Sequence, residues 1–330
     1  MIDISPSDLK AVLHSKRANI YYLEHCRVLV NGGRVEYVTD EGKRSLYWNI
    51  PIANTTTVLL GTGTSVTQAA MREFAKAGVL VGFCGGGGTP LFSGAEFEVE
   101  VAWLSPQSEY RPTEYLQHWV RFWFDDKLRL QAAKDFQQAR LVRLRQHWLT
   151  SRTLKDQQFV VNPEAFESLL DQSSQAIGAA SDNTTLLTEE ARLTKQLYRL
   201  ATQAVKYGDF VRGKRGEGTD AANQFLDHGN YLAYGLAATA SWVLGLPHGL
   251  AVLHGKTRRG GLVFDVADLV KDAVILPQAF ISAMRGATEQ EFRQACIEAL
   301  TRSESLDFMI DTLKGVAMRV GQMAQQKTDA

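Results

Sequence analysis

The sequence predicts an α+β protein in which a small β-sandwich-like N-terminal domain is followed by a larger all-α domain. Three observations lead to this prediction. Short runs rich in valine and tyrosine occupy the N-terminal third, Pro106 and Pro112 bracket a linker, and from Thr113 onward the apolar residues recur with helical spacing. We therefore expect a β-rich domain over residues 1–105 and an α-helical domain over residues 106–330.

The β-rich part is predicted from short apolar runs separated by turn residues. Asn31-Gly32-Gly33 lies between two of these runs and indicates a tight hairpin. Val66–Ala77 has the spacing of a short helix, with Ser65 as its expected cap. The expected strands are Ala18–Leu23, Arg27–Val30, Val35–Val38, Thr57–Leu60 and Val79–Phe83.

The all-α part is predicted from seven periodic segments, and Pro277 is expected to kink the fifth. Residues 229–253 contain no Asp, Glu, Lys or Arg and are long enough to cross a membrane. Their polar side chains and four glycines favour a buried core helix instead. The expected helices are 114–149, 163–179, 189–207, 220–245, 265–285, 289–302 and 305–326.

The composition excludes several classes of protein. Of the 330 residues, 45% are hydrophobic and 22% charged, which is typical of a globular chain and not of a disordered one. Because 36 basic residues balance 36 acidic ones, a polyanion would have to bind to a local patch. The three cysteines (Cys26, Cys84 and Cys296) are too scattered for a zinc site, and no signal peptide is recognisable. We expect buried thiols in a reducing compartment.

The segment 247–272 carries the residues most suited to chemistry. His254 ends an apolar run, and Asp265 and Asp268 lie three residues apart, which places both carboxylates on one helix face. One imidazole with carboxylates suits Mg²⁺ or Mn²⁺. Lys256, Arg258 and Arg259 lie between them and could bind phosphates. The alternative is a helix whose first turn is acidic only because the helix dipole favours this.

A second acidic pair, Glu189-Glu190, begins another predicted helix. Its simplest explanation is a charged first turn behind a Thr188 cap. The face that follows consists mainly of small residues, which would allow another helix to approach and leave Glu190 facing inward.

The long segment 114–149 and the residues after it are rich in basic and aromatic side chains. Either a solvated helix face or a surface that follows a DNA backbone would explain this composition. The basic residues are Arg121, Lys127, Arg129, Lys134, Arg140, Arg143, Arg145, Arg152 and Lys155.

Four elements in this order resemble the CRISPR-associated adaptation integrase, the first of the numbered Cas proteins, and are most similar to its I-F subtype. Glu190-Ala191 with Tyr198 matches the pattern around the family's glutamate, and Asn223 with Leu226 matches its Asn-x-x-Leu element. Leu253-His254-Gly255 matches its Leu-His-Gly motif, and Asp265 with Asp268 matches its Asp-x-x-Asp/Glu element. The resemblance covers nearly the whole chain.

This resemblance implies a metal-dependent DNA endonuclease and integrase that joins short foreign fragments to a CRISPR repeat by transesterification. It implies that Glu190, His254 and Asp268 bind Mg²⁺ or Mn²⁺, with Asp265 beside them as a fourth catalytic residue. Double-stranded and branched DNA would be the substrates, and the β-rich domain would form a homodimer. A second adaptation subunit, fused to a helicase-nuclease in this subtype, would be a partner in the prokaryotic cytoplasm, with no membrane involved.

One departure from the family pattern lies after the Asn-x-x-Leu element, where His228 and Asn230 stand in place of the tyrosines of many relatives. Two other functions remain open from the residues alone. One is a non-catalytic DNA-binding scaffold whose carboxylates only cap helices. The other is a metal-dependent phosphohydrolase for small phosphate esters, which would have a closed pocket and substrate binding nearly independent of salt.

Overall fold

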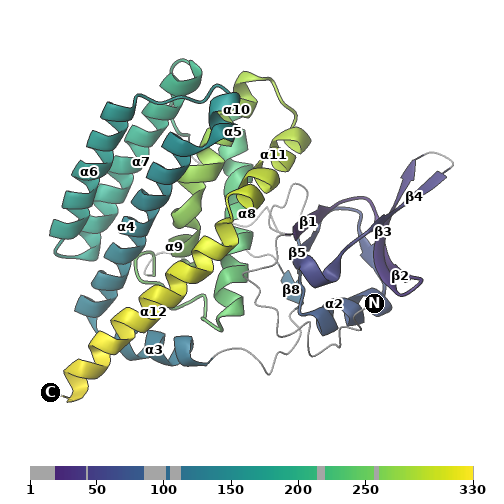
Figure 1. Ribbon diagram of the computed structural model, residues 1–330, viewed down its shortest axis with the longest axis horizontal. Helices are drawn as coiled ribbons and strands as arrows, with labels where there is room; N and C mark the ends of the chain where they lie inside the picture. The colour runs from purple at the N-terminus through teal and green to yellow at the C-terminus, as the bar shows by residue number, and fades with distance from the viewer. Residues whose placement is uncertain are drawn as a thin grey trace. The chain divides into compact units, whose positions relative to one another are not determined.

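The computed structural model describes residues 19–41, 44–84, 102–104, 113–213, 220–255 and 260–329. The chain divides into two compact units, Met1–Arg111 and Pro112–Ala330. Strands are concentrated in the first unit and helices fill the second (Figure 1). The predicted fold class, N-terminal sheets followed by a larger helical part, is confirmed.

Two four-stranded sheets build the first unit. One sheet has the order β1-β5-β7-β8, with β1, β5 and β7 parallel and β8 antiparallel to β7. The other has the order β4-β3-β2-β6, in which β2, β3 and β4 are antiparallel neighbours. The strands are β1 (Asn19–Leu23), β2 (Arg27–Asn31), β3 (Arg34–Glu41), β4 (Arg44–Asn49), β5 (Thr55–Leu60), β6 (Ser65–Val66), β7 (Leu80–Phe83) and β8 (Ala102–Leu104).

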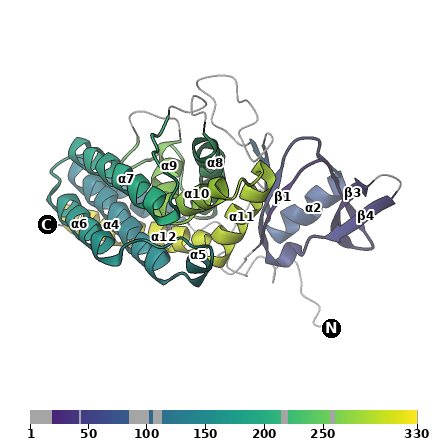
Figure 2. The ribbon, with the colours of Figure 1, turned by 90° about the horizontal axis from the view of Figure 1, so that it is seen from above.

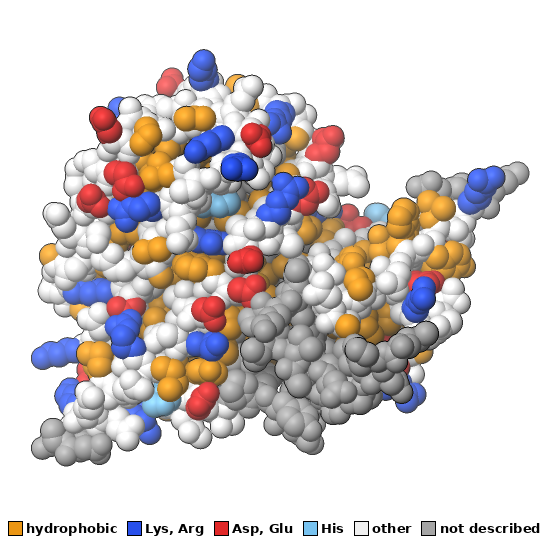
Figure 3. Space-filling view, viewed as in Figure 1, with side chains coloured by type: hydrophobic (Ala, Val, Ile, Leu, Met, Phe, Trp, Pro, Cys, Tyr) orange, Lys and Arg blue, Asp and Glu red, His pale blue; other side chains and the backbone are white. Residues whose placement is uncertain are grey.

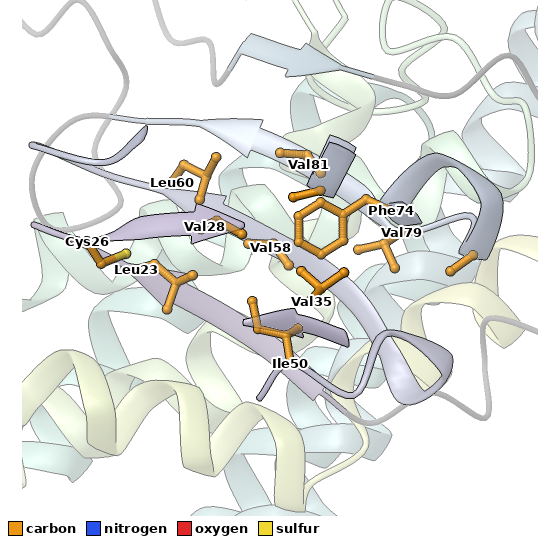
Figure 4. Close-up of a cluster of buried hydrophobic side chains, with 12 residues drawn as sticks. Leu23, Cys26, Val28, Val35, Ile50, Val58, Leu60, Phe74, Val79 and Val81 are labelled. Carbon is orange, nitrogen blue, oxygen red and sulfur yellow. The ribbon is translucent and has the colours of Figure 1, made fainter. Parts of the chain in front are cut away.

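Apolar side chains from both sheets and from helix α2 (Gln68–Ala77) form the core of this unit. Phe74 of α2 is fully buried, and its ring lies beside Val35, Val58 and Val81 (Figure 4). Cys26 and Cys84 are buried here as free thiols, and Cys296 is buried in the helical unit, as the sequence predicted.

Two local predictions have different outcomes. The hairpin at Asn31-Gly32-Gly33 is confirmed, because β2 pairs antiparallel with β3 and both glycines have positive φ, at 55° and 79°. Ser65 is not the cap of α2. It lies in β6, and the side chain of Thr67 accepts the capping hydrogen bond from the Ala70 amide.

Strand β4 was missed because its sequence does not alternate between apolar and polar residues. It is an edge strand whose side chains are almost all exposed. No buried face imposes a pattern on such a strand, so the sequence carries no periodic signal.

The second unit is built from helices that pack against one another lengthwise. Helices α4, α6 and α7 run side by side in both ribbon views (Figures 1 and 2). The helices are α3 (Glu114–Trp123), α4 (Asp126–Thr150), α5 (Arg152–Asp156), α6 (Pro163–Ala179), α7 (Asn183–Val205), α8 (Ala221–Val243), α9 (Gly261–Val270), α10 (Leu276–Met284), α11 (Glu289–Arg302) and α12 (Ser305–Asp329).

The predicted helix 114–149 is in fact two helices. α3 ends at Trp123, and α4 begins after Asp125, whose carboxylate accepts hydrogen bonds from the amides of Lys127 and Leu128. A carboxylate in this capping position stabilises a new helix start, and apolar periodicity alone does not reveal the break.

The predicted helix 265–285 is interrupted as expected near Pro277, by a π-helical turn, η4 (Lys271–Ile275), between α9 and α10. Because proline has no N–H, it cannot donate to the Ala273 carbonyl four residues earlier. The indole Nε1 of Trp148 lies 3.2 Å from this carbonyl and 3.2 Å from that of Asp272. A side chain of α4 therefore supplies the hydrogen bond that Pro277 cannot make.

Helix α8 is buried along most of its length, as predicted for the helix over residues 220–245. Among the described residues, no helix is both long and apolar enough to cross a membrane. α8 is surrounded by other helices, including α9, α10 and α12. Its apolar character thus reflects a central place in the helical unit.

The imidazole of His147 in α4 makes stability depend on pH. Burial and the Arg143 guanidinium lower the pKa of His147 from 6.5 to about 4. The unfolded chain therefore binds this proton at a higher pH than the folded chain, so stability present above pH 6.5 is lost as the pH falls to about 4. Between pH 6.5 and about 4, the free energy of unfolding of the wild type should fall by about 3 kcal/mol more than that of His147→Gln. Urea unfolding followed by tryptophan fluorescence measures it; an identical pH dependence in both proteins would contradict the prediction.

Candidate metal centre

Three elements of the helical unit bring one side chain each to a common point. Glu190 comes from α7, His254 from the segment after α8, and Asp268 from α9. One ligand atom of each lies within 4.8 Å of the other two. His254 Nε2 is 3.6 Å from Glu190 Oε2 and 4.0 Å from Asp268 Oδ2. Among the described residues this is the cluster with metal-binding geometry.

Neither acidic motif lies in a first helical turn. α9 begins at Gly261, so Asp265 and Asp268 occupy its middle and its last turn. α7 begins at Asn183, with Asp182 as its cap, so the predicted start at residue 189 is wrong. Thr188 does not cap the helix, since its hydroxyl donates to the Thr184 carbonyl within it. The alternative explanation of both motifs as charged first turns is therefore wrong.

Asp265 holds the histidine segment and does not face the cluster directly. Its Oδ2 accepts hydrogen bonds from the Val252 and Leu253 amides at 2.7 and 3.2 Å, and its Oδ1 accepts one from the His254 amide at 3.0 Å. Oδ1 also lies 2.7 Å from Nδ1 of the imidazole. With Nδ1–H donating to this carboxylate, Nε2 is the nitrogen left to bind a cation.

The surroundings of His254 favour its charged form. Burial alone would lower the pKa of the imidazole, but hydrogen bonds to Asp265 and Glu190 and the charges of Asp268 and Asp265 raise it to about 10. Without a cation, the imidazole of His254 is therefore doubly protonated at neutral pH, with one proton on Nδ1 and one on Nε2. A divalent cation that binds Nε2 would displace the proton on that nitrogen.

Two cations, the buried Arg140 and the partly buried Lys271, compensate the carboxylates. Lys271 forms an ion pair with Asp268 Oδ1, and the guanidinium of Arg140 forms one with Asp272 and lies 3.8 Å from Glu190 Oε1. Burial would raise the pKa of Glu190, but the His254 hydrogen bond and the Arg140 and Lys271 charges lower it to about 2. Glu190 is therefore ionised.

The donor set fits a divalent cation that prefers oxygen ligands. Asp268 is 2% exposed, and burial raises its pKa. Apart from the ion pair with Lys271, neither of its oxygens accepts a hydrogen bond from any residue that the structure describes. Two carboxylates and one imidazole nitrogen, with an acceptor left over inside the protein, suit Mg²⁺ or Mn²⁺.

The neighbouring Glu189 is held away from this point. Both of its carboxylate oxygens lie 2.7 Å from nitrogens of the Arg192 guanidinium. The adjacent glutamates therefore have different environments, and Glu190 is the one that faces His254.

The basic residues predicted to bind DNA have two outcomes. Lys256, Arg258 and Arg259 lie outside the described residues. Several basic residues of the long segment make contacts within the protein: Arg140 is 1% exposed, Arg145 pairs with Glu167 and Asp171, and Lys134 donates to the Gly178 carbonyl. On the face shown in Figure 3, basic and acidic side chains are interspersed over the helical unit. Arg140 is therefore not part of an exposed basic surface, whereas the choice between a solvated face and a DNA-binding surface for the other basic residues of this segment stays a prediction.

Two other residues of the family-like elements, Asn223 and His228, contact residues outside the cluster. Asn223 accepts hydrogen bonds from the Arg212 side chain and the Gly213 amide and donates to the Val211 carbonyl. It thereby ties the segment after α7 to α8. His228, which departs from the tyrosine that the resemblance led us to expect, has its Nδ1 3.7 Å from Glu289 on α11.

Sequence reasoning missed the two cations that balance the centre. Arg140 was grouped with a surface stripe, although it is the one basic residue there that is fully buried. Lys271 lies three residues after Asp268, a spacing that brings side chains together on a helix and could have drawn attention to it.

Fold and cluster together define an α+β protein whose helical unit carries a candidate divalent-cation centre. Residues 21–296 match the family described as "CRISPR associated protein Cas1". The chain therefore belongs to the CRISPR-associated Cas1 family.

Two curated relatives carry the name "CRISPR-associated endonuclease Cas1". The protein from Pseudomonas aeruginosa (strain UCBPP-PA14) is 72% identical, and that from Pectobacterium atrosepticum is 68% identical. Each alignment covers 97% of this chain and 98% of the relative. The recognised family and the class of enzyme are confirmed by these matches.

Solved structures share the fold at low sequence identity. The structure titled "Crystal structure of TtCas1-DNA complex" has a TM-score of 0.62 and 22% identity, covering 90% of this chain and 91% of that one. The structure titled "Casposase bound to integration product" has a TM-score of 0.64 and 13% identity, covering 86% and 82%.

We expect Asp265→Asn to weaken cation binding about 10- to 100-fold, because the amide cannot fix the histidine tautomer and places an NH₂ group against backbone donors. Isothermal titration with Mn²⁺ measures the affinity. Asp311→Asn, at an exposed aspartate that forms an ion pair with Lys314 three residues away, is the matched control. Equal affinities of the two variants would contradict the positioning role of Asp265.

Proposed function

We propose that this chain is a divalent-metal-dependent DNA endonuclease and integrase that inserts short foreign DNA fragments into a CRISPR array by transesterification. The observation that carries the proposal is the convergence of Glu190, His254 and Asp268 from three separate elements. Membership of the Cas1 family, and relatives named endonucleases, support the choice of DNA as the substrate.

The proposed centre acts through charge and position. A bound Mg²⁺ or Mn²⁺ supplies a Lewis acid for the scissile phosphate and the departing 3′-oxygen. Glu190 and Asp268 would hold the cation with their carboxylates, and His254 would hold it through Nε2. Asp265 keeps the imidazole oriented, so that the ligand atom does not have to reorganise during the reaction.

The buried cations have a second consequence in this proposal. Arg140 and Lys271 face the two ligand carboxylates, and burial is offset by the carboxylate charges, which raise the pKa of each cation. Both side chains therefore stay charged and limit the excess negative charge of the centre. This lowers the electrostatic cost of bringing a phosphodiester to two buried carboxylates.

The proposal includes partners beyond the DNA. Joining both ends of a fragment calls for two centres, which favours a homodimer formed through the β-rich unit. The family resemblance adds a second adaptation subunit, in the I-F subtype fused to a helicase-nuclease. Lys256, Arg258 and Arg259 are proposed to contact phosphates, and the reaction is placed in the prokaryotic cytoplasm.

The first test is the activity of ligand variants on branched DNA that resembles a half-integrated fragment. In Mn²⁺ or Mg²⁺ we expect Glu190→Gln and Asp268→Asn to lower the rate of strand cleavage and joining about a hundredfold or more, because the Lewis acid supplies several kcal/mol. Glu189→Gln is the matched control and should keep most of the wild-type rate. EDTA should abolish the wild-type reaction.

Other outcomes favour the competing functions. Equal rates for Glu190→Gln and Glu189→Gln would contradict the metal centre. Salt-sensitive DNA binding without any metal-dependent reaction would favour a non-catalytic scaffold. Hydrolysis of small phosphate esters with little dependence on salt would favour a phosphohydrolase.

A further inference from the structure

The segment Leu250–His254 is buried at Ala251, Val252 and Leu253 but belongs to no helix or strand. The backbone N–H and C=O groups of such a segment need partners from elsewhere, because unpaired polar groups inside a protein are costly. The Leu250 N–H donates to the Pro247 carbonyl, and the partners described below are side chains of three different helices.

Three consecutive carbonyl groups of the segment accept hydrogen bonds from side chains. Trp119 Nε1 donates to the Leu250 carbonyl at 2.9 Å, and Trp123 Nε1 donates to the Ala251 carbonyl at 2.7 Å. Asn183 Nδ2, at the start of α7, donates to the Val252 carbonyl at 3.1 Å. The two tryptophans lie four residues apart on α3, so their indoles are on one face of that helix.

The N–H groups on the other side of the same segment bind a single carboxylate. The amides of Val252, Leu253 and His254 all donate to Asp265. The backbone that carries the histidine is thus held between α9 on its donor side and α3 with α7 on its acceptor side.

We propose that Trp123, with Trp119 and Asn183, forms a clamp that positions His254 for cation binding; this rests on the proposed metal-dependent function. The carbonyl contacts fix the segment along its length, and Asp265 then fixes the imidazole. Without the carbonyl contacts, the distance from Nε2 to Glu190 and Asp268 would depend more heavily on Asp265.

The helix that carries the clamp is itself firmly anchored. α3 packs along α12, and the Trp119 ring meets Phe136 of α4 edge-on with a centroid distance of 6.2 Å. The Cζ atom of Arg129 lies over the indole of Trp123, 5.3 Å from the ring centroid. Arg129 also donates a hydrogen bond to the Trp123 carbonyl. The indole donors are therefore fixed relative to α4, the helix that supplies Arg140.

Trp123→Phe isolates the clamp, because it removes the indole N–H and keeps an aromatic ring at a half-buried site. Trp48→Phe is the matched control: it removes an indole N–H that lies 3.4 Å from Thr39 Oγ1 in the sheet unit. Asn183→Asp is a second variant of nearly the same shape. It replaces the Nδ2 donor by a carboxylate oxygen, which cannot donate a hydrogen bond to the Val252 carbonyl. An aspartate in this first helical turn is favourable for α7, so the helix should persist.

Two readouts test the proposal. Hydrogen exchange of the Val252, Leu253 and His254 amides, measured in EDTA, should become about tenfold faster in Trp123→Phe and Asn183→Asp. Isothermal titration with Mn²⁺ should show an affinity about tenfold lower in these variants, with the unfolding temperature in EDTA close to that of the wild type. Trp48→Phe should change neither readout.

Each other outcome has a definite meaning. Unchanged exchange, faster exchange with unchanged Mn²⁺ affinity, or an equal loss of affinity in Trp48→Phe would each overturn the clamp. If wild-type protein binds no Mn²⁺, the proposed function fails. The exchange rates in EDTA then still decide whether Trp123 and Asn183 hold the segment.

Discussion

The carboxylate of Asp265 is the constraint on which the candidate centre depends. It accepts three backbone hydrogen bonds from residues 252–254 and contacts Nδ1 of His254. These charge-assisted bonds turn an irregular segment into a fixed support for one imidazole nitrogen. Glu190 and Asp268 can form a cluster with that nitrogen because both come from helices, whose backbones are already rigid.

The balance of buried charge is a second feature of the centre. Glu190, Asp265, Asp268 and Asp272 bring four carboxylates together, and Arg140, Lys271 and the protonated His254 bring three cations. Removing any one partner would leave an uncompensated charge inside the protein. The interruption at η4 belongs to the same region, because Lys271 opens the π-helical turn directly after α9.

The fold and the cluster could be predicted from the sequence to different depths. The order of elements followed from periodicity, and α6 was predicted with its observed bounds, 163–179. The break between α3 and α4 and the edge strand β4 were missed, because a capping carboxylate and an exposed strand leave no periodic trace. The motifs that carry Glu190, His254 and Asp268 were found, whereas Arg140 was assigned to a surface because its spacing resembles that of its exposed neighbours.

The sequence by itself determined the fold class, the family and the residue types available for a metal centre, since these depend on local pattern and on motif order. The resemblance already placed Asp268 among the metal ligands and Asp265 beside them, and only the tertiary structure showed that Asp265 orients the histidine segment. The two aspartates are three residues apart on one helix, and their roles differ because different elements pack against each. The tryptophan contacts to Leu250 and Ala251 join residues more than a hundred positions apart, so no local pattern encodes them.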